Sequence, residues 1–242
     1  LERYLDIKGD EDLRVLKHAF LNSYFQTGLK SNIDEAVIKR GIEHGLDEIS
    51  TKYVKVDEIP FDFSRRRLSI IVNDGTKTQL ITKGAVEEIL NICTLVDYKG
   101  KVEPITNSIK ENIKKITKEL NKQGLRVVAV CQKNDLNKTE EFNVSDEKNM
   151  VLIGFIGFLD PPKETAKSSI EKLGKNGIRV IVLTGDNVEV TRCVCDKVGI
   201  KSNRIVTGAQ IDKLADQGLK RLLKKTNIFA KLSPIQKARI VR

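Results

Sequence analysis

Two short polar stretches follow apolar runs in the second half of the chain, and both carry groups that handle phosphate or metal. In "IRVIVLTGDN", Thr184 supplies a hydroxyl and Asp186 a carboxylate that can bind a metal ion or a ribose hydroxyl. In "VLIGFIGFLDPPKET", Asp160 precedes Pro161 and Pro162. Each stretch alone is slightly better explained as a turn, because Gly and Pro favour turns and proline keeps the preceding residue extended.

A lysine near the end of the chain raises a similar question. In "SPIQKARIV", Ser233 is a candidate N-cap and Pro234 a candidate first helical residue, which puts Lys237 in the first turn. A cation there opposes the helix dipole. The mismatch suggests that Lys237 faces an anion, although an ordinary surface lysine is the simpler interpretation of this segment alone.

The first half contains the parts of an adenine site. In "FDFSRRR", Phe63 can stack on a purine with Arg65 near a phosphate, and in "ITKGA", Lys83 supplies a cation beside the bare backbone of Gly84. Each feature has a structural alternative: a core phenylalanine, a basic edge that prevents strand pairing, and a Lys-Gly strand end. Each alternative is individually favoured over the functional interpretation.

Helices and an antiparallel sheet are expected to position these first-half residues. Apolar spacing predicts helices over 11–28, 32–45, 85–93 and 108–123, with Asn32 and Ser108 as candidate N-caps and Gly124 as a stop. Two β-branched runs around an Asp-Gly pair predict a hairpin over 67–84. This half is predicted to be an α+β domain, mostly antiparallel sheet with helices packed on it.

The pattern changes near residue 150. Apolar strands over 150–160 and 178–186 alternate with helices over 163–177 and 188–200. Such alternation predicts a parallel sheet with right-handed crossovers, whose sites form at the carboxyl ends of the strands. The sequence therefore predicts two domains, residues 1–149 and 150–242.

Composition narrows the function classes. Apolar residues make up 40% of the 242 residues and charged residues 31%, and no stretch reaches the 18 apolar residues of a membrane helix. The formal charge of +10 suits an anionic partner, but the absence of Trp leaves few stacking residues for nucleic acid. Four cysteines without a C-x-x-C pair and two isolated histidines predict no zinc site; we expect buried free thiols in a reducing compartment.

The ordered set of motifs is more specific than any single motif. Along the chain come "DEA", "FDFSRRR", "KGA", "GLRVVAV", "LDPPK", "LTGDN" and "FAKLSPIQK". Over nearly its whole length, the chain resembles the cytoplasmic region of P-type cation-transporting ATPases. The stretches "FDFSRRRLSIIV", "KGAVEEILNIC" and "FLDPPKETA" look most like the bacterial magnesium-transporting members. The resemblance implies that residues 1–149 form a nucleotide-binding domain, and that 150–242 form part of a phosphorylation domain of the haloacid-dehalogenase type, truncated at both ends.

The resemblance also implies roles for single residues. Phe63 matches the aromatic that stacks on adenine, and Lys83 lines that pocket, with Gly84 allowing close approach. The ATP-binding set is completed by residues on the phosphate side and by an acid that is usually Glu: Arg65, Arg126 and Asp34.

In the second domain, the resemblance places Thr184 and Asp186 beside the phosphoryl group and Lys237 on its oxygens. Lys231 stands where many members have Arg; it keeps the charge but loses the bidentate fork. The strand-end and hinge residues are Asp160, Pro161 and Pro162. No Mg²⁺ ligand is expected within this chain.

Members of this family transfer the ATP γ-phosphate to an aspartate and then hydrolyse the acyl phosphate, with ATP and Mg²⁺ as cofactors. The motif with that aspartate is expected before Leu1, and the Mg²⁺-binding motif after Arg242. We therefore expect a nucleotide-binding fragment that is inactive alone, does not enter the membrane, and works at the cytoplasmic face with the actuator and transmembrane domains of its pump.

Magnesium is the favoured transported ion, and calcium or another cation is the alternative. Two rival classes are ranked far behind: a free-standing phosphatase of the dehalogenase superfamily, and a basic nucleic-acid-binding module. The phosphatase would need an Asp-x-Asp nucleophile motif, and none follows position 150.

Overall fold

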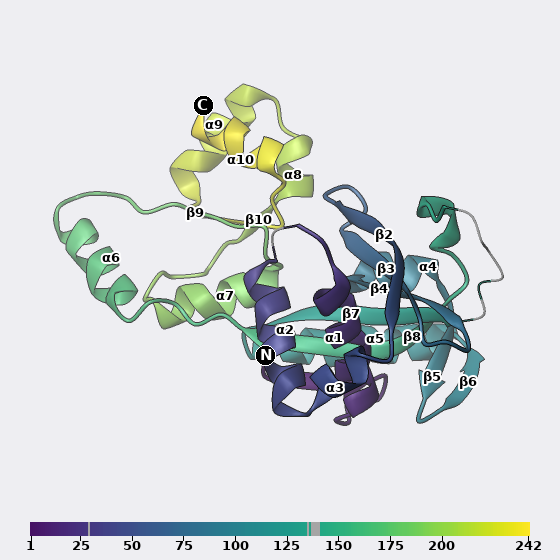
Figure 1. Ribbon diagram of the computed structural model, residues 1–242. Coiled ribbons are helices and arrows are strands. Elements are labelled where there is room, and N and C mark those ends of the chain that lie inside the picture. Colours follow the sequence, from purple (N-terminus) through teal and green to yellow (C-terminus); the bar gives the residue numbers. More distant parts are fainter. Residues whose placement is uncertain (29, 135, 137–140) are drawn as a thin grey trace. The chain divides into compact units, whose positions relative to one another are not determined.

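The computed structural model describes residues 1–28, 30–134, 136 and 141–242. The chain forms two compact units (Figure 1), which are described separately below. The first contains residues 1–117 and 127–158, and the second residues 118–126 and 159–242.

A mixed sheet is the framework of the first unit. Its strands lie in the order β2 (Val54–Asp62), β3 (Arg67–Asn73), β4 (Thr78–Ala85), β7 (Leu125–Asn134), β8 (Met150–Leu159), β5 (Cys93–Tyr98) and β6 (Lys101–Pro104), and β1 (Arg3–Asp6) also pairs with β8. Strand β2 pairs antiparallel with β3, β3 with β4, and β4 with β7. The predicted hairpin is confirmed: β3 and β4 pair in register, and Gly75 has the positive φ of +87° that its turn requires.

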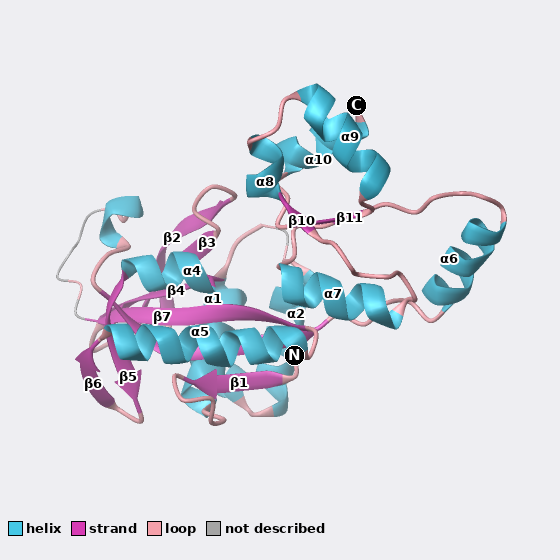
Figure 2. Cartoon of the chain, turned by 180° about the vertical axis from the view of Figure 1, so that it is seen from behind, coloured by secondary structure: helices cyan, strands magenta, loops and turns pink. Residues whose placement is uncertain are grey.

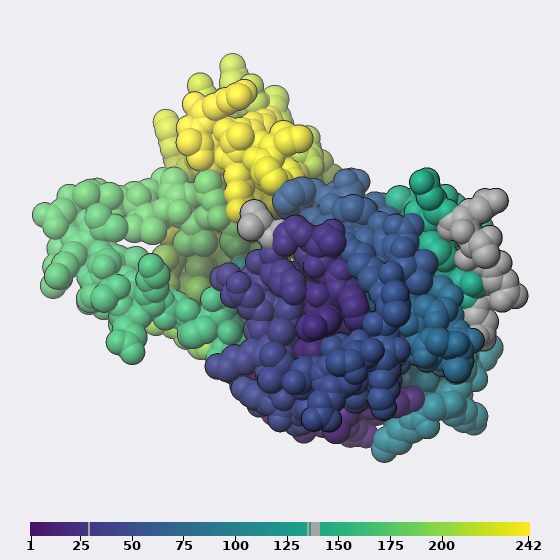
Figure 3. All heavy atoms as spheres, in the orientation of Figure 1, coloured from purple at the N-terminus to yellow at the C-terminus, as the bar shows by residue number. Residues whose placement is uncertain are grey.

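Helices cover both faces of this sheet, because side chains of successive strand residues point to opposite faces. Ile70 of β3 packs in one core cluster with α1 (Leu13–Phe25) and α2 (Asn32–Glu43), whereas its neighbour Ile71 packs in the other with α4 (Val86–Ile92) and α5 (Asn107–Lys122). Figure 2 shows α4 and α5 on their side of the sheet. In Figure 3, α1, α2 and α3 (Leu46–Ser50), in purple to blue, form one continuous surface.

Two predicted helix starts need correction by one or two residues. Ser31, not Asn32, caps α2, and it forms a capping box with Asp34. Helix α5 begins at Asn107, and the hydroxyl of Thr106, not Ser108, accepts the N–H of Ile109 at 3.2 Å. Gly124 follows this helix with a φ of +87°, as expected of a helix stop.

The largest departure from the sequence prediction concerns β8. We expected residues 150–160 to open the parallel sheet of the second domain. Instead, β8 lies in the middle of the first unit's sheet, parallel to β5 over Met150–Leu152 and antiparallel to β1 over Gly154–Gly157. A continuous apolar run indicates a strand that is buried on both faces. Any central strand of a sheet with helices on both faces is buried in this way. Consequently, the first compact unit includes residues 127–158; the division into domains of residues 1–149 and 150–242 stays a prediction.

The second unit is built around a small parallel sheet with strand order β10-β11-β9. Its elements are α6 (Thr165–Lys175), β9 (Val182–Leu183), α7 (Val188–Lys197), β10 (Val206–Thr207), α8 (Gly208–Asp212), α9 (Asp216–Lys225), β11 (Ile228–Ala230) and α10 (Pro234–Val241). The predicted alternation of parallel strands and helices is confirmed here, although β9 is shorter than the predicted strand over 178–186. The dehalogenase-type fold of this unit stays a prediction.

The cysteines are unpaired. Cys93 and Cys131 are buried in the first unit and Cys195 in the second, while Cys193 is half-buried. Among the described residues, no three or more His, Cys, Asp or Glu side chains group as metal ligands. Within the same residues, no helix is both long and apolar enough to cross a bilayer.

Candidate functional site

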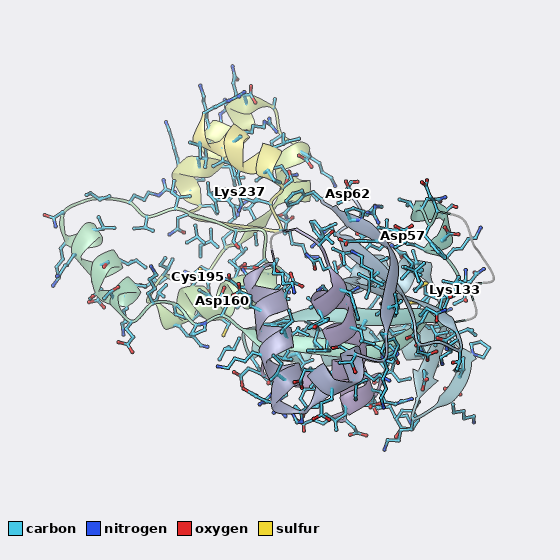
Figure 4. The ribbon with its side chains drawn as sticks, viewed as in Figure 1. Asp57, Asp62, Lys133, Asp160, Cys195 and Lys237 are labelled. Carbon is cyan, nitrogen blue, oxygen red and sulfur yellow. The ribbon has the colours of Figure 1, made fainter. Side chains whose placement is uncertain are left out.

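An exposed aromatic ring marks the turn between β2 and β3. Asp62, at the end of β2 (Figure 4), accepts the backbone N–H groups of Ser64 and Arg65 at 2.9 and 2.8 Å, which closes the turn. Phe63 is 76% exposed, and its ring meets that of Phe61 edge-on at 5.3 Å. A flat apolar ring held in solvent is suited to stacking on a flat ligand. The alternative of a core phenylalanine is therefore wrong.

Arg65 lies in the same turn but is already paired. One nitrogen of its guanidinium donates to both carboxylate oxygens of Glu147 at 2.9 Å, and Nε of Arg67 donates to the same carboxylate at 2.7 Å. The side chain of Glu147 is fully buried. A phosphate would thus have to compete with an ion pair for Arg65, which the sequence did not indicate.

A buried ion pair lies between α2 and β4, where the sequence placed two residues of the adenine pocket. Nζ of Lys83 donates to Asp34 and, at 2.6 Å, to the hydroxyl of Ser23; Lys83 and Asp34 are 8% and 3% exposed. The other oxygen of Asp34 accepts the N–H and the hydroxyl of Ser31 at 2.9 and 2.6 Å.

The surroundings of this pair affect both groups. Burial lowers the pKa of Lys83, against the opposing effect of Asp34. For Asp34, burial works to raise the pKa, but the charge of Lys83 and the hydrogen bonds from Lys83 and Ser31 outweigh it and lower the pKa. Both shifts fit a charged pair whose carboxylate is the better stabilised partner.

Gly84 has a structural reason to be glycine. A Cβ on this residue would lie 2.5 Å from Cβ of Arg67 and 2.6 Å from the carbonyl oxygen of Arg66. Neither is the end of a flexible side chain, so the close approach that Gly84 permits is that of β3. Its expected role in admitting a ligand stays a prediction.

In the second unit, the predicted phosphoryl-side residues meet one another. Arg126 makes a two-pronged contact with Asp186, Nε to Oδ1 at 2.8 Å and an Nη nitrogen to Oδ2 at 2.9 Å, and reaches Asp160 at 3.5 Å. The hydroxyl of Thr184 donates to Asp186 at 2.8 Å. Arg126 was expected on the phosphate side, and in the structure it contacts Asp186 and lies near Asp160; its contact with phosphate stays a prediction.

A cavity of about 240 Å³ opens beside these residues. Its lining combines the charged pair with the proline turn and one face of α7: Gly124, Arg126, Asp160, Pro161, Pro162, Asp186, Val190 and Val194. The proline turn therefore shapes a cavity as well as ending β8. Two carboxylates and one guanidinium make part of this lining charged.

Two lysines lie on the loop and helix that follow β11. The N–H of Lys231, which has a φ of +52°, donates to the carbonyl oxygen of Asp186 at 2.7 Å, and this holds the two loops together. Ser233 caps α10 and Pro234 is near its start, as predicted. Lys237 is half-buried in the next turn (Figure 4), and its contact with an anion stays a prediction.

Sequence reasoning missed the partners that fix these residues. Glu147 follows Arg65 by 82 residues, and Ser23 precedes Lys83 by 60. No local spacing links such pairs, because the sheet brings them together. The pairing of Asp34 with Lys83 was likewise not foreseen, although both were assigned to one site.

Comparison with known proteins supplies independent information. Residues 22–165 match the family model described as "P-type ATPase, cytoplasmic domain N". The whole chain is 43% identical over 242 residues to the magnesium-transporting ATPase, P-type 1, of Escherichia coli K12, of which it covers 27%. It is 37% identical over 246 residues to a protein of that name from Salmonella typhimurium LT2, again covering 27% of it. A calcium-transporting ATPase of Listeria monocytogenes is 31% identical over 81% of the chain, which spans 22% of that protein.

Proposed function

Since the chain belongs to the P-type ATPase family, we propose that its first unit binds the ATP that drives a cation pump, with Mg²⁺ as the transported ion. The high identity to magnesium-transporting relatives over the full chain supports the choice of ion. The alternative transported ion is calcium, because a less similar relative is named a calcium-transporting ATPase. The chain spans about a quarter of these relatives, so we propose that it acts with the rest of such a pump at the cytoplasmic face of a membrane.

The exposed ring of Phe63 is the observation that carries the proposal. An aromatic side chain 76% in water leaves apolar surface hydrated, and stacking on adenine would cover that surface. Other exposed apolar residues belong to β2, but the Asp62 turn fixes the backbone beside Phe63. We propose that adenine stacks on this ring.

Lys83 is the second residue of the first unit for which we propose a contact with the base. The β3–β4 register pairs Lys83 with Leu68, at the start of β3 and just after the turn that carries Phe63. A lysine ammonium has three N–H groups, and Ser23 and Asp34 use two of them within the described chain. We propose that the third donates to a ring nitrogen of adenine, with Asp34 holding the ammonium in place.

For the second unit by itself, we propose that the residues around Asp186 bind a phosphoryl group. The guanidinium of Arg126 can exchange carboxylate partners for phosphate oxygens, since both suit its fork. Thr184, Asp186, Lys231 and Lys237 would contribute on the phosphoryl side. The described residues do not fit a dedicated Mg²⁺ site, because no cluster of three acidic ligands is present among them; we propose that Mg²⁺ arrives bound to the ATP phosphates.

Calorimetric titration of the 242-residue chain with ATP and with adenosine tests this function. We expect both ligands to bind, and Phe63→Ala to weaken both by about 1–3 kcal/mol, the range for base–aromatic stacking. Val56→Ala is the matched control, because Val56 of the neighbouring strand β2 is also apolar and is 50% exposed. Unchanged affinity in the Phe63 variant would remove the stacking site.

A further inference from the structure

Glu147 is the most completely enclosed acid at the candidate site. Its side chain is 0% exposed, and its carboxylate accepts hydrogen bonds from Arg65 at 2.9 Å, from Arg67 at 2.7 Å and from the hydroxyl of Ser69 at 2.6 Å. Ser69 is in turn 2.7 Å from the hydroxyl of Thr82 on β4. An ionised carboxylate removed from water needs such saturation. These hydrogen bonds therefore hold the carboxylate of Glu147 in one position beside β3.

The segment that carries Glu147 is itself anchored. Asn143 and Asp146 form a capping box around the short helix η1 (Val144–Asp146), directly before Glu147. The N–H of Phe142 donates to Asp57 of β2 at 2.9 Å. Glu147 thus joins two parts of the first unit that are distant in sequence.

Arg65 connects this fixed carboxylate to the turn that presents Phe63. Its guanidinium binds Glu147 through one nitrogen and the carbonyl oxygen of Pro60 through another, at 2.5 Å. The turn is consequently held on both sides of Phe63, by Pro60 and by Arg65. Its next residue, Arg66, has a φ of +51°, a left-handed conformation that most residues adopt only when the surroundings hold it.

We propose that Glu147 is a positioning residue for the nucleotide site: through Arg65 it fixes the turn that presents Phe63 to the base. Arg65 acts as a brace in this arrangement and does not bind phosphate directly. Ordering the turn before the ligand arrives removes an entropic cost from binding. The inference rests on the proposed ATP binding and adds a residue, Glu147, to which neither the motifs nor the resemblance assigns a role.

The two roles of Arg65 make opposite predictions for Glu147→Gln. Loss of the carboxylate charge frees Arg65. If Arg65 binds phosphate, ATP should bind more tightly and adenosine should be unaffected. If Arg65 is a brace, the turn loosens, and adenosine and ATP should both bind more weakly by the same factor, which we expect to be roughly threefold to tenfold. Calorimetric titration with the two ligands distinguishes these results.

A double-mutant cycle separates positioning from general damage to the fold. In a Phe63→Ala background, Glu147→Gln should cause no further loss of affinity, because the group that it positions is gone. An additive loss, or tightening of ATP alone, would overturn the proposal. Glu141→Gln is the matched control, because Glu141 is exposed in the same segment. Arg65→Lys, which keeps the charge but loses the fork, should weaken adenosine and ATP equally, even if Glu147→Gln does not fold.

Amide hydrogen exchange gives a readout that needs no ligand. The N–H groups of Ser64 and Arg65 are hydrogen-bonded to Asp62, so loosening of the turn should speed their exchange in Glu147→Gln and in Arg65→Lys. Unchanged exchange at both amides would refute the bracing role. If the parent chain binds neither ligand, the proposed function fails, whereas the exchange result still decides whether Glu147 orders the turn.

Discussion

At the scale of single residues, Lys83 and Asp34 form a buried ion pair. Both side chains are almost fully buried, with Ser23 and Ser31 completing their hydrogen bonds. Both charges are removed from water. Removing one of them therefore leaves the other as an unpaired buried charge, which destabilises the fold. The carboxylate of Asp34 reaches the ammonium of Lys83 directly.

A double-mutant cycle on this pair should be strongly non-additive. Lys83→Met leaves the Asp34 carboxylate buried without its cation, and we expect a loss of about 3–5 kcal/mol in the free energy of unfolding. Lys83→Met combined with Asp34→Leu removes both charges and should cost clearly less than the sum of the single changes. Urea unfolding at neutral pH measures each variant. Additive losses would mean that the two groups do not interact in the folded chain.

Some residues could be assigned from sequence and others could not, for a physical reason. The hairpin turn at Gly75, the helix stop at Gly124 and the start of α10 at Ser233 depend on local backbone chemistry, which the sequence displays directly. The restraint of Arg65 by Glu147 depends on contacts across the sheet. The functional roles of the candidate site residues stay predictions, and the hydrogen bonds among these residues could not be predicted from local spacing.

At the scale of elements, the β3–β4 contact depends on one missing side chain. Gly84 pairs with Arg67, and the space for its Cβ is filled by the backbone and Cβ of the neighbouring strand. The turn that carries Phe63 directly precedes β3, and Lys83 lies near the end of β4. The spacing of the two strands therefore sets the distance between two proposed contacts to the base.

Gly84→Ala should push these strands apart. We expect a loss of about 1–3 kcal/mol in stability, the usual range for overpacking, because no flexible side chain can yield. Gly174→Ala in α6 is the contrasting variant: nothing lies within 4 Å of its added Cβ, so it should be neutral or stabilise its own unit by up to about 1 kcal/mol. Thermal unfolding of each variant checks the signs. A neutral Gly84→Ala would show that β3 can shift without cost.

The assignment of β8 shows a limit at the same scale. Its apolar run correctly predicted a buried strand, but burial cannot say which sheet contains the strand. Residues 150–152 pair with β5 and 154–157 with β1, so the sheet is decided by partners from elsewhere in the chain. Residues 150–158 of β8 accordingly belong to the first compact unit.

At the scale of the whole molecule, charge is unevenly divided. Acidic and basic residues nearly balance in the first unit, so essentially all of the formal charge of +10 belongs to the second. The first unit, for which base stacking is proposed, is thus nearly neutral, and the second unit is strongly basic.

The buried cysteines offer a consequence of a different kind, because a thiol reacts with an alkylating reagent only when it reaches solvent. Cys93 and Cys131 lie in the first unit's core, where burial raises the pKa of Cys131 and keeps it unreactive, and Cys195 is buried in the second unit (Figure 4). Alkylation rates measured by peptide mass spectrometry therefore report how fast each unit opens to solvent. ATP should slow the labelling of Cys93 and Cys131 by mass action, more than that of Cys195. Equal protection of all three thiols would indicate that the units open together.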